Sequence, residues 1–381
     1  MNKACIIGIS GYGRVHYNLL TAEQAAGNVE IVGATVINQD EEQEKCAHLR
    51  SIGCRLFDDY RVMLKELSGT ADLCCIPTGT PLHRPMTVAA LEAGMHVFVE
   101  KPVAGSMADV QAMQAAADQA GRRVAVGYQQ MYDPTTLELK RAILDGRIGA
   151  VNCIKCRVAW PRDSAYYNRN GWAGKLRVDN TWVLDSPMNN AVAHDLMMML
   201  FLAGPTVEQA ATPRSVEAEL YRANNIESAD TVGLRVQTDT GIPLLFYATH
   251  ACNRSFGPEL QARGTDGTIL WTHNKAVIET PTGGKQALDK LPDGPLRKRM
   301  IRSVLDMAAG GDSFYCDLDV ASRQTMVITK AHEVSEIQPV AGERVLLDNG
   351  AVRTVIPGIE EVIENAFAQE ILFHDNDFSR T

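Results

Sequence analysis

The sequence lacks any apolar run of 18 or more residues, so we expect no membrane-spanning helix. Its first ten residues hold only a short apolar stretch broken by Gly8, which predicts a strand rather than a signal peptide. An excess of positive charge is also absent, because 46 acidic residues outnumber 37 basic ones and the formal net charge is -9. Nucleic acids and anionic membranes repel such a surface, so we expect neither as a partner.

The sequence also lacks a pattern of cysteines typical of disulfide bonds. The nine cysteines are odd in number, scattered, and mostly set in apolar strand-like runs, a pattern typical of reduced thiols that fill the core of a cytoplasmic protein. Cys153 and Cys156 have the spacing of metal ligands, but no second pair follows. They also stand three positions apart in an alternating segment, so their side chains face opposite sides. We therefore expect no metal site.

What the 381 residues do contain is material for two domains. In the first third, apolar strand-like runs alternate with helical segments, one of which opens with the capping box Ser106-x-x-Asp109. The runs cover residues 4–9, 30–36, 54–57, 72–76, 97–99 and 123–127. This alternation predicts an α/β fold, a doubly wound parallel sheet over residues 1–128.

The turn after the first strand carries a glycine pattern. Gly8, Ser10 and Gly13 occupy the three positions of G-x-G-x-x-G, with serine in place of the middle glycine and Gly11 as an extra one. A dinucleotide site needs a tight turn, close backbone approach to the pyrophosphate, and helix N–H groups that point at it. Serine is small enough to permit that approach, so we expect a dinucleotide here.

The choice between NAD and NADP depends on the end of the second strand. The usual ribose-binding acid would fall near Val36 and Ile37, and Asn38 and Asp40 follow directly. No arginine or lysine stands beside them to receive a 2′-phosphate, so the sequence favours NAD. Arg14, just past the glycines, leaves NADP open.

The fifth apolar run, residues 97–99, ends at Glu100, Lys101 and Pro102. Proline cannot continue a central ladder, so the strand stops there and Lys101 lies at a carboxyl end, the edge where open α/β sheets bind ligands. A lysine held there is a candidate for proton transfer. The alternative is a solvated lysine beside a solvated glutamate.

Together with Thr80-Pro81-x-His83, the run 90–102 and a later histidine before a helix, these motifs resemble the Gfo/Idh/MocA oxidoreductases, relatives of glucose–fructose oxidoreductase and inositol dehydrogenase. The resemblance implies a Rossmann domain followed by an α+β domain with a large open mixed or antiparallel sheet, here residues 129–381. It further implies a homodimer or homotetramer. The expected reaction is reversible hydride transfer between a nicotinamide cofactor and a carbinol carbon of a sugar, cyclitol or sugar derivative.

The resemblance also assigns roles. Lys101 would contact the reacting hydroxyl, Thr80 and Pro81 would border the nicotinamide, and Glu100 would hold the cofactor side of the site. His83 has an alternative role as a cap of the following helix, and we expect His16 to be a packed helix residue. The cofactor-binding set comprises Gly8, Ser10, Gly11, Tyr12, Gly13, Arg14, Asn38, Thr78, Thr80, Pro81, His83, Glu100, Lys101 and Gln129.

The second half holds the catalytic candidates Asn190 and His194, four residues apart, which would share one helical face if the turn there is regular. The family pattern has an aspartate, three residues, and then a histidine; here Asn190 stands in the place of the aspartate. An amide orients a hydroxyl but cannot accept its proton, so proton transfer would depend on Lys101 and His194. Asp185 or Asp195 could replace the missing carboxylate, or the chemistry could differ. The alternative role of His194 is that of a packed core histidine.

Residues 166–175 combine aromatic rings and cations, which suit a polyhydroxylated ring; the alternative is a surface loop with a packed tryptophan. His250 and Asn253 are further candidates. The expected substrate-binding residues are Lys101, Tyr166, Arg169, Trp172, Lys175, Asn189, Asn190 and His194.

Residues 280–302, rich in glycine, proline and lysine, are expected to form a surface loop whose basic cluster, Arg297 to Arg302, is a solvated face. Residues 317–335 are predicted to form a long helix.

The sequence is compatible with three functions. The first is an NAD(P)-dependent oxidoreductase acting on a carbohydrate or polyol. The second is an enzyme that retains its cofactor, borrows and returns a hydride, and cleaves a glycoside or isomerises a sugar. The third is a sensor that holds a dinucleotide without turnover, which the departures at Ser10 and Asn190 suggest.

Overall fold

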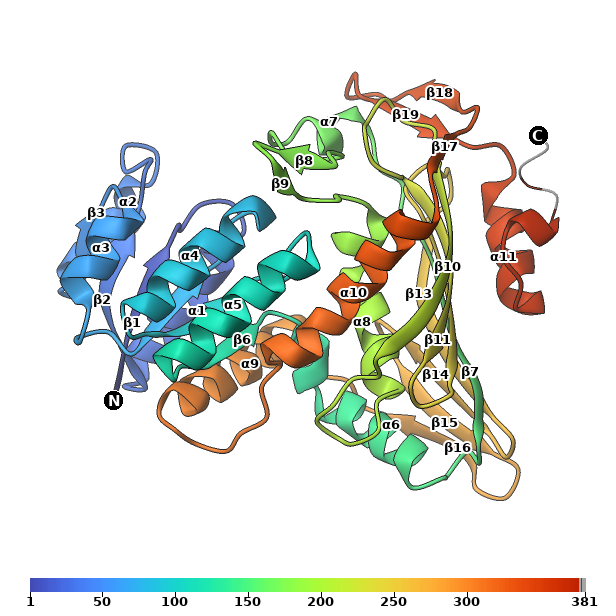
Figure 1. The fold of residues 1–381 in the computed structure, drawn as a ribbon, viewed down its shortest axis with the longest axis horizontal. Helices are drawn as coiled ribbons and strands as arrows, with labels where there is room; N and C mark the ends of the chain where they lie inside the picture. The colour runs from blue at the N-terminus through green and yellow to red at the C-terminus, as the bar shows by residue number, and fades with distance from the viewer. Residues whose placement is uncertain (377, 379–381) are drawn as a thin grey trace. The chain divides into compact units, whose positions relative to one another are not determined.

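The computed structural model describes residues 1–376 and 378, which fall into two compact units (Figure 1). The first unit comprises Met1–Tyr132 and Pro292–Ser322, and the second comprises Asp133–Leu291 and the chain from Arg323 on. The sequence placed one boundary at residue 128. The chain leaves the first unit four residues later and then returns to it for a second segment.

The first unit contains a six-stranded parallel sheet. Its strands are β1 (Asn2–Ile7), β2 (Val29–Thr35), β3 (Arg55–Phe57), β4 (Leu73–Ile76), β5 (His96–Val99) and β6 (Val124–Val126). Their order, β3-β2-β1-β4-β5-β6, is that of a Rossmann sheet, so the predicted doubly wound fold is confirmed. The topological switch lies between β1 and β4, where such sheets bind ligands.

The helices that connect these strands are α1 (Gly13–Ala25), α2 (Gln43–Ser51), α3 (Tyr60–Leu67), α4 (Thr80–Glu92) and α5 (Met107–Ala120), and the short η1 (Gln129–Tyr132) follows β6. The capping box before α5 is confirmed, because Ser106 Oγ accepts a hydrogen bond from the Asp109 backbone N–H. Gly121 ends the same helix with a left-handed backbone, φ 59°.

A helix, α9 (Asp293–Ala308), forms where a surface loop was expected, so that prediction is wrong. Leu296, Met300, Ile301 and Val304 recur at helical spacing and are buried, which explains why the segment folds as a helix despite its cations. Arg302 lies at the side of this helix and pairs with the buried Glu23 of α1 at 3.1 Å.

The second unit is built on a nine-stranded sheet with the order β16-β15-β14-β13-β7-β12-β11-β10-β17. β7 pairs in parallel with β12, and β10 with β17, while the other pairs are antiparallel, so the predicted large mixed sheet is confirmed. The strands are β7 (Val151–Ala159), β10 (Pro213–Arg222), β11 (Thr231–Thr238), β12 (Pro243–Thr249), β13 (Phe256–Gly264), β14 (Thr268–Thr272), β15 (Ala276–Thr280), β16 (Gly284–Leu288) and β17 (Ile337–Pro339).

Helices lie on both faces of this sheet: α8 on one and α11 on the other (Figure 1). Cys153 belongs to the apolar cluster under α11, whereas Cys156 lies near Asp195 of α8, as the alternation of β7 predicts. The helical elements are α6 (Pro134–Leu144), α7 (Ser164–Tyr167), η2 (Pro187–Asn189), α8 (Ala193–Leu202), α10 (Leu318–Val334, whose first residues fall in the first unit), α11 (Ile359–Gln369) and η3 (His374–Asn376). Two small hairpins complete the unit, β8 (Arg177–Val178) with β9 (Thr181–Trp182), and β18 (Glu343–Leu346) with β19 (Val352–Val355).

All nine cysteines are buried and unpaired, as expected. In the described part of the chain, no helix is both long enough and apolar enough to cross a bilayer. Nor do three or more histidine, cysteine, aspartate or glutamate side chains gather as metal ligands among residues 1–376 and 378.

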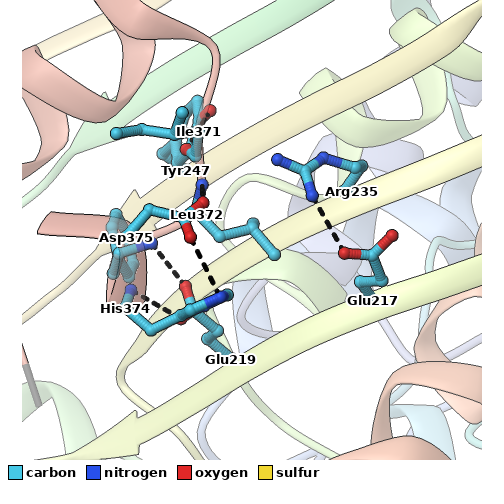
Figure 2. A network of polar contacts seen from close by, with 9 residues as sticks. Glu217, Glu219, Arg235, Tyr247, Ile371, Leu372, His374 and Asp375 are labelled. Carbon is cyan, nitrogen blue, oxygen red and sulfur yellow. Dashed lines mark hydrogen bonds and ion pairs between the residues drawn. The ribbon is translucent and has the colours of Figure 1, made fainter.

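The segment after α11 is held to the sheet by one carboxylate of β10 (Figure 2). Glu219 accepts hydrogen bonds from the Phe373 backbone N–H at 2.6 Å, from the His374 backbone N–H at 2.8 Å and from the His374 ring at 2.6 Å. Tyr247 of β12 adds a hydrogen bond to the Ile371 carbonyl at 2.8 Å. Glu219 is buried, so these three donors replace the water that its charge has lost.

We expect Glu219→Ala to lower the free energy of unfolding by about 3 kcal/mol, because three donors lose their charged acceptor. The matched control is Glu217→Ala, two residues away on β10, whose half-exposed carboxylate meets only Arg235 in Figure 2 and should cost at most about 1 kcal/mol. Urea unfolding followed by intrinsic fluorescence compares them. Equal losses would show that Glu219 does not hold the segment.

Candidate functional site

The turn between β1 and α1 has the backbone geometry of a dinucleotide cradle. Gly8 and Gly11 have positive φ angles, 91° and 54°, and α1 begins at Gly13. A Cβ at Gly13 would lie 2.6 Å from the Gly8 carbonyl oxygen, so only glycine fits there. No side chain caps the N-terminus of α1. The backbone of the turn can therefore approach a pyrophosphate closely.

Ser10 has a role that glycine could not perform. Its hydroxyl donates to Asn38 Oδ1 at 3.1 Å, and Asn38 Nδ2 donates in turn to Glu41 at 2.8 Å. Lys45 donates both to Glu42 at 2.5 Å and to the Ile9 carbonyl at 3.2 Å. The hydrogen bond from Lys45 lowers the pKa of Glu42. Acidic residues were expected at the end of β2. Glu41 and Glu42 lie a few residues beyond it, and neither was predicted from the sequence.

The turn between β4 and α4 contains Thr78, Thr80 and Pro81, with Gly79 as the N-cap of α4. His83, in the first turns of α4, is buried, and its ring nitrogens lie 2.8 Å from the Pro102 carbonyl and 3.0 Å from the Thr78 carbonyl. Burial lowers the pKa of His83, although the carbonyls of Thr78 and Pro102 oppose this shift. His83 therefore braces this turn against the segment that follows Lys101, and does not cap the helix as the alternative proposed.

Under Lys101 lies a buried carboxylate–imidazole pair. Glu100 accepts from His16 Nε2 at 2.8 Å and from the Lys101 backbone N–H at 3.1 Å, and both side chains of the pair are almost fully buried. A Cβ at Gly127 would lie 2.7 Å from the Glu100 carboxylate, so β6 must end in glycine. Lys101 itself is partly exposed at the carboxyl end of β5.

Two charges act on this pair. Burial raises the pKa of Glu100, but the hydrogen bond and charge of His16 and the charge of Lys101 outweigh it, so the pKa lies below its usual range. His16 also stacks on Phe98, with ring centroids 4.8 Å apart. His16 was expected to be only a packed helix residue; it is packed, and it also holds Glu100.

Nearby, Gln129 is buried with its Oε1 unpaired, in place to receive a donor.

We expect His16→Leu to lower the free energy of unfolding by about 3 kcal/mol at neutral pH, because Glu100 keeps its charge but loses its partner. The loss should shrink as the pH falls through the ordinary range of glutamate, since a carboxyl with a depressed pKa stabilises the fold only while ionised. His48→Leu, at an exposed histidine of α2, is the control. Urea unfolding from pH 7 to pH 4 measures both, and a loss independent of pH would contradict this account.

In the second unit, the turn around Asn190 is not regular. Pro187 opens η2, which ends at Asn189, and Asn190 follows with φ -135° and ψ -81°, outside the helical region. α8 starts only at Ala193, so the condition for a shared helical face of Asn190 and His194, a regular turn, is not met. Instead, Asn190 Nδ2 donates to Asp185 Oδ1 at 2.7 Å.

Asp185 is the acid that stands beside Asn190. It is buried, and its second oxygen accepts from the Gly174 backbone N–H at 2.6 Å. Asp195 is buried in the first turn of α8, near Cys156 of β7. Asn189 is buried too, and it donates to the Val183 carbonyl at 2.9 Å and accepts from Gln324 at 3.1 Å. Asp185, one of the two predicted substitutes for the family aspartate, is hydrogen-bonded to Asn190.

The aromatic segment forms a cluster of rings and cations. The guanidinium carbon of Arg169 lies 3.7 Å from the centre of the Tyr166 ring and 5.2 Å from that of Trp172. The guanidinium carbon of Arg162 lies 4.7 Å from the centre of the same Tyr166 ring. The centres of the Tyr166 and His250 rings lie 5.7 Å apart. Arg162 was not predicted as a site residue. Its position was a sequence signal for one, because it follows Trp160 and Pro161 directly after the end of β7.

Two other candidates make different contacts. Lys175 pairs with Glu227 at 2.7 Å on the surface, so its ammonium already has a counterion. The Asn253 backbone N–H donates to Glu360 of α11 at 2.8 Å.

Comparisons with known proteins place both domains in one family. The family model "Oxidoreductase family, NAD-binding Rossmann fold" matches residues 3–128, and the "GFO/IDH/MocA C-terminal domain" matches residues 136–270. The first unit is therefore an NAD-binding Rossmann domain.

Relatives in sequence include inositol 2-dehydrogenase of Klebsiella pneumoniae strain 342, 28% identical over 216 residues, which are 56% of this chain and 58% of that protein. Myo-inositol 2-dehydrogenase of Thermotoga maritima is 24% identical over 232 residues, 59% of this chain and 64% of that protein. The chain thus matches somewhat more than half the length of these curated relatives.

Among solved structures, the WlbA dehydrogenase of Bordetella pertussis in complex with NADH and UDP-GlcNAcA has a TM-score of 0.71 at 23% identity, covering 87% of this chain and 96% of that one. This likeness concerns the fold. With both domain models matched in order, the chain belongs to the Gfo/Idh/MocA oxidoreductase family.

Proposed function

We propose that this protein is an NAD-dependent oxidoreductase that transfers a hydride between the cofactor and a carbinol carbon of a sugar, cyclitol or sugar derivative. The observation that carries the proposal is Lys101, held at the carboxyl end of β5 above the buried Glu100–His16 pair. The named activity of the inositol dehydrogenase relatives supports a polyhydroxylated substrate.

The residues of the first unit fit a dinucleotide. The backbone of Gly8, Gly11 and Gly13 leaves room for the pyrophosphate, and Asn38 with the acids behind it suits ribose hydroxyls better than a 2′-phosphate. When bound, NAD supplies the acceptor for a hydride. Tyr12, Arg14, Thr78, Thr80 and Pro81 line the turns on either side and complete the proposed contacts, together with Gln129.

During oxidation Lys101, as the neutral amine, takes the proton of the substrate hydroxyl, and during reduction it returns that proton from its ammonium form. We propose Lys101, His194 and Asn190 as the catalytic groups. Asn190 cannot accept a proton. Its amide nitrogen donates to Asp185 Oδ1, and this hydrogen bond fixes how the amide is turned. Asp185 thereby acts on substrate through Asn190 and is a positioning residue.

Tyr166, Arg169 and Trp172 form the proposed wall for the carbohydrate. We further propose a cytoplasmic location, which the nine buried free thiols support, and assembly into a homodimer or homotetramer.

Lys101→Met should lower kcat by about 10²- to 10⁴-fold, the usual contribution of one general acid–base group. NAD affinity should stay within about threefold, because the cradle does not depend on the lysine side chain. Lys65→Met, at an exposed lysine of α3, controls for the loss of one charge. The assay follows NADH absorbance with a substrate found by screening polyols and aldoses. Wild-type turnover by Lys101→Met would refute the assignment.

Gly13→Ala should weaken NAD binding by tenfold or more, on the order of 1.4 kcal/mol, because the new methyl group meets the Gly8 carbonyl and displaces the turn. Gly294→Ala in α9 is the control, since a Cβ there meets no atom within 4 Å. Calorimetric titration with NAD compares the two. Unchanged affinity in Gly13→Ala would place the dinucleotide elsewhere.

A further inference from the structure

We propose that the second unit carries an oxyanion subsite formed by Arg162 and Arg169, and that the substrate is therefore a carbohydrate that bears a carboxylate or phosphate group. The inference rests on the proposed function, because it narrows the substrate class of the same site. Neutral polyols would lack the group that this subsite binds.

Both cations are held in place by one ring. Arg162 and Arg169 approach Tyr166 at 4.7 Å and 3.7 Å, and Arg162 also lies 5.8 Å from the Trp160 ring. The backbone N–H of Arg162 donates to the His250 carbonyl at 3.1 Å, and Arg169 donates to the Tyr166 carbonyl at 2.6 Å. Stacking on aromatic faces restricts both side chains before a ligand arrives, which lowers the entropic cost of binding.

Among the described residues, 1–376 and 378, no carboxylate forms an ion pair with Arg162, and its Nε is buried without a hydrogen-bond acceptor. Its side-chain partner is Tyr166, whose pKa is raised by burial, so the phenol is neutral. By contrast, Arg157 of β7 pairs with Glu259 at 2.7 Å. A partly buried guanidinium that lacks an anion is suited to bind one, often with two parallel hydrogen bonds.

The nearby carboxylates do not cancel the two positive charges. Asp185 lies 3.9 Å from Arg169 and is already used by Gly174 and Asn190. Asp163, the residue after Arg162, caps α7 by accepting from the Tyr166 backbone N–H. Arg162 therefore remains the cation that a ligand can engage.

His250 supplies the matching contact for a sugar hydroxyl. It is 2% exposed, and its Nδ1 lies 2.9 Å from the Trp160 carbonyl, which makes Nδ1 the donor. Nε2 then carries a lone pair, and it has no partner. Burial and the charges of Arg162 and Arg169 lower the pKa of His250 to about 3, so the ring stays neutral. A buried acceptor beside two cations fits a ligand that combines hydroxyl groups with an oxyanion.

The test is calorimetric titration of the NAD-loaded protein with matched ligands: glucose, glucuronate, glucose 6-phosphate and UDP-glucose. We expect at least one anionic ligand to bind about tenfold or more tightly than glucose, as charge-assisted hydrogen bonds require. Glucuronate and the phosphorylated sugars distinguish a carboxylate from a phosphate. Arg162→Gln should abolish the preference, and Arg162→Lys should restore it only in part.

Arg177→Gln is the matched control, because Arg177 also stacks on an aromatic ring, Trp182 at 3.4 Å, but lies exposed on the β8–β9 hairpin. It should keep the preference. Equal affinity for glucose and the anionic ligands, no binding of any anionic ligand, or an intact preference in Arg162→Gln would overturn the subsite. Turnover of neutral polyols without an anionic preference would leave the proposed function standing, whereas tight anion binding without NADH formation would refute only the proposed function.

Discussion

The hydrogen bond between His16 and Glu100 is the interaction on which the cofactor domain depends. It joins the helix after the glycine turn to the end of β5, two segments 84 residues apart. A carboxylate buried at the carboxyl end of β5 would be costly alone, and the imidazole offsets that cost. Because Glu100 also accepts from the Lys101 backbone, the same contact fixes where the lysine leaves the strand.

A second constraint acts around Lys101. The two ring nitrogens of His83 contact two carbonyls: that of Thr78, in the turn after β4, and that of Pro102, in the turn after β5. These contacts hold the two turns together. Gly127 completes the arrangement, because any side chain there would strike Glu100. The Glu100–His16 pair and His83 thus fix the backbone on either side of Lys101 through separate hydrogen bonds.

The second domain uses its charges differently. On the side of the sheet that α11 covers, carboxylates are matched by donors, as Glu219 is by Phe373 and His374. Around Tyr166 the balance changes, since two guanidinium groups stack on one ring and, among the described residues, only Arg169 forms an ion pair with a carboxylate. Sites that await a ligand keep such unmatched charges, whereas structural clusters satisfy theirs.

Local pattern was sufficient for much of the first domain. Apolar runs, glycine positions and capping residues act within a few residues, so the sequence by itself determined the parallel sheet, the turn at Gly8 to Gly13 and the strand end at Lys101. It failed at α9, where cations between the buried positions obscured a helical period, and it left open whether the turn at Asn190 is regular, which its backbone is not. Only the tertiary structure decided that His16 meets Glu100, that Asp185 holds Asn190 and that Arg162 lies beside His250. Those contacts join residues that no local periodicity relates, because buried polar groups are satisfied by whatever partner the packed fold brings near.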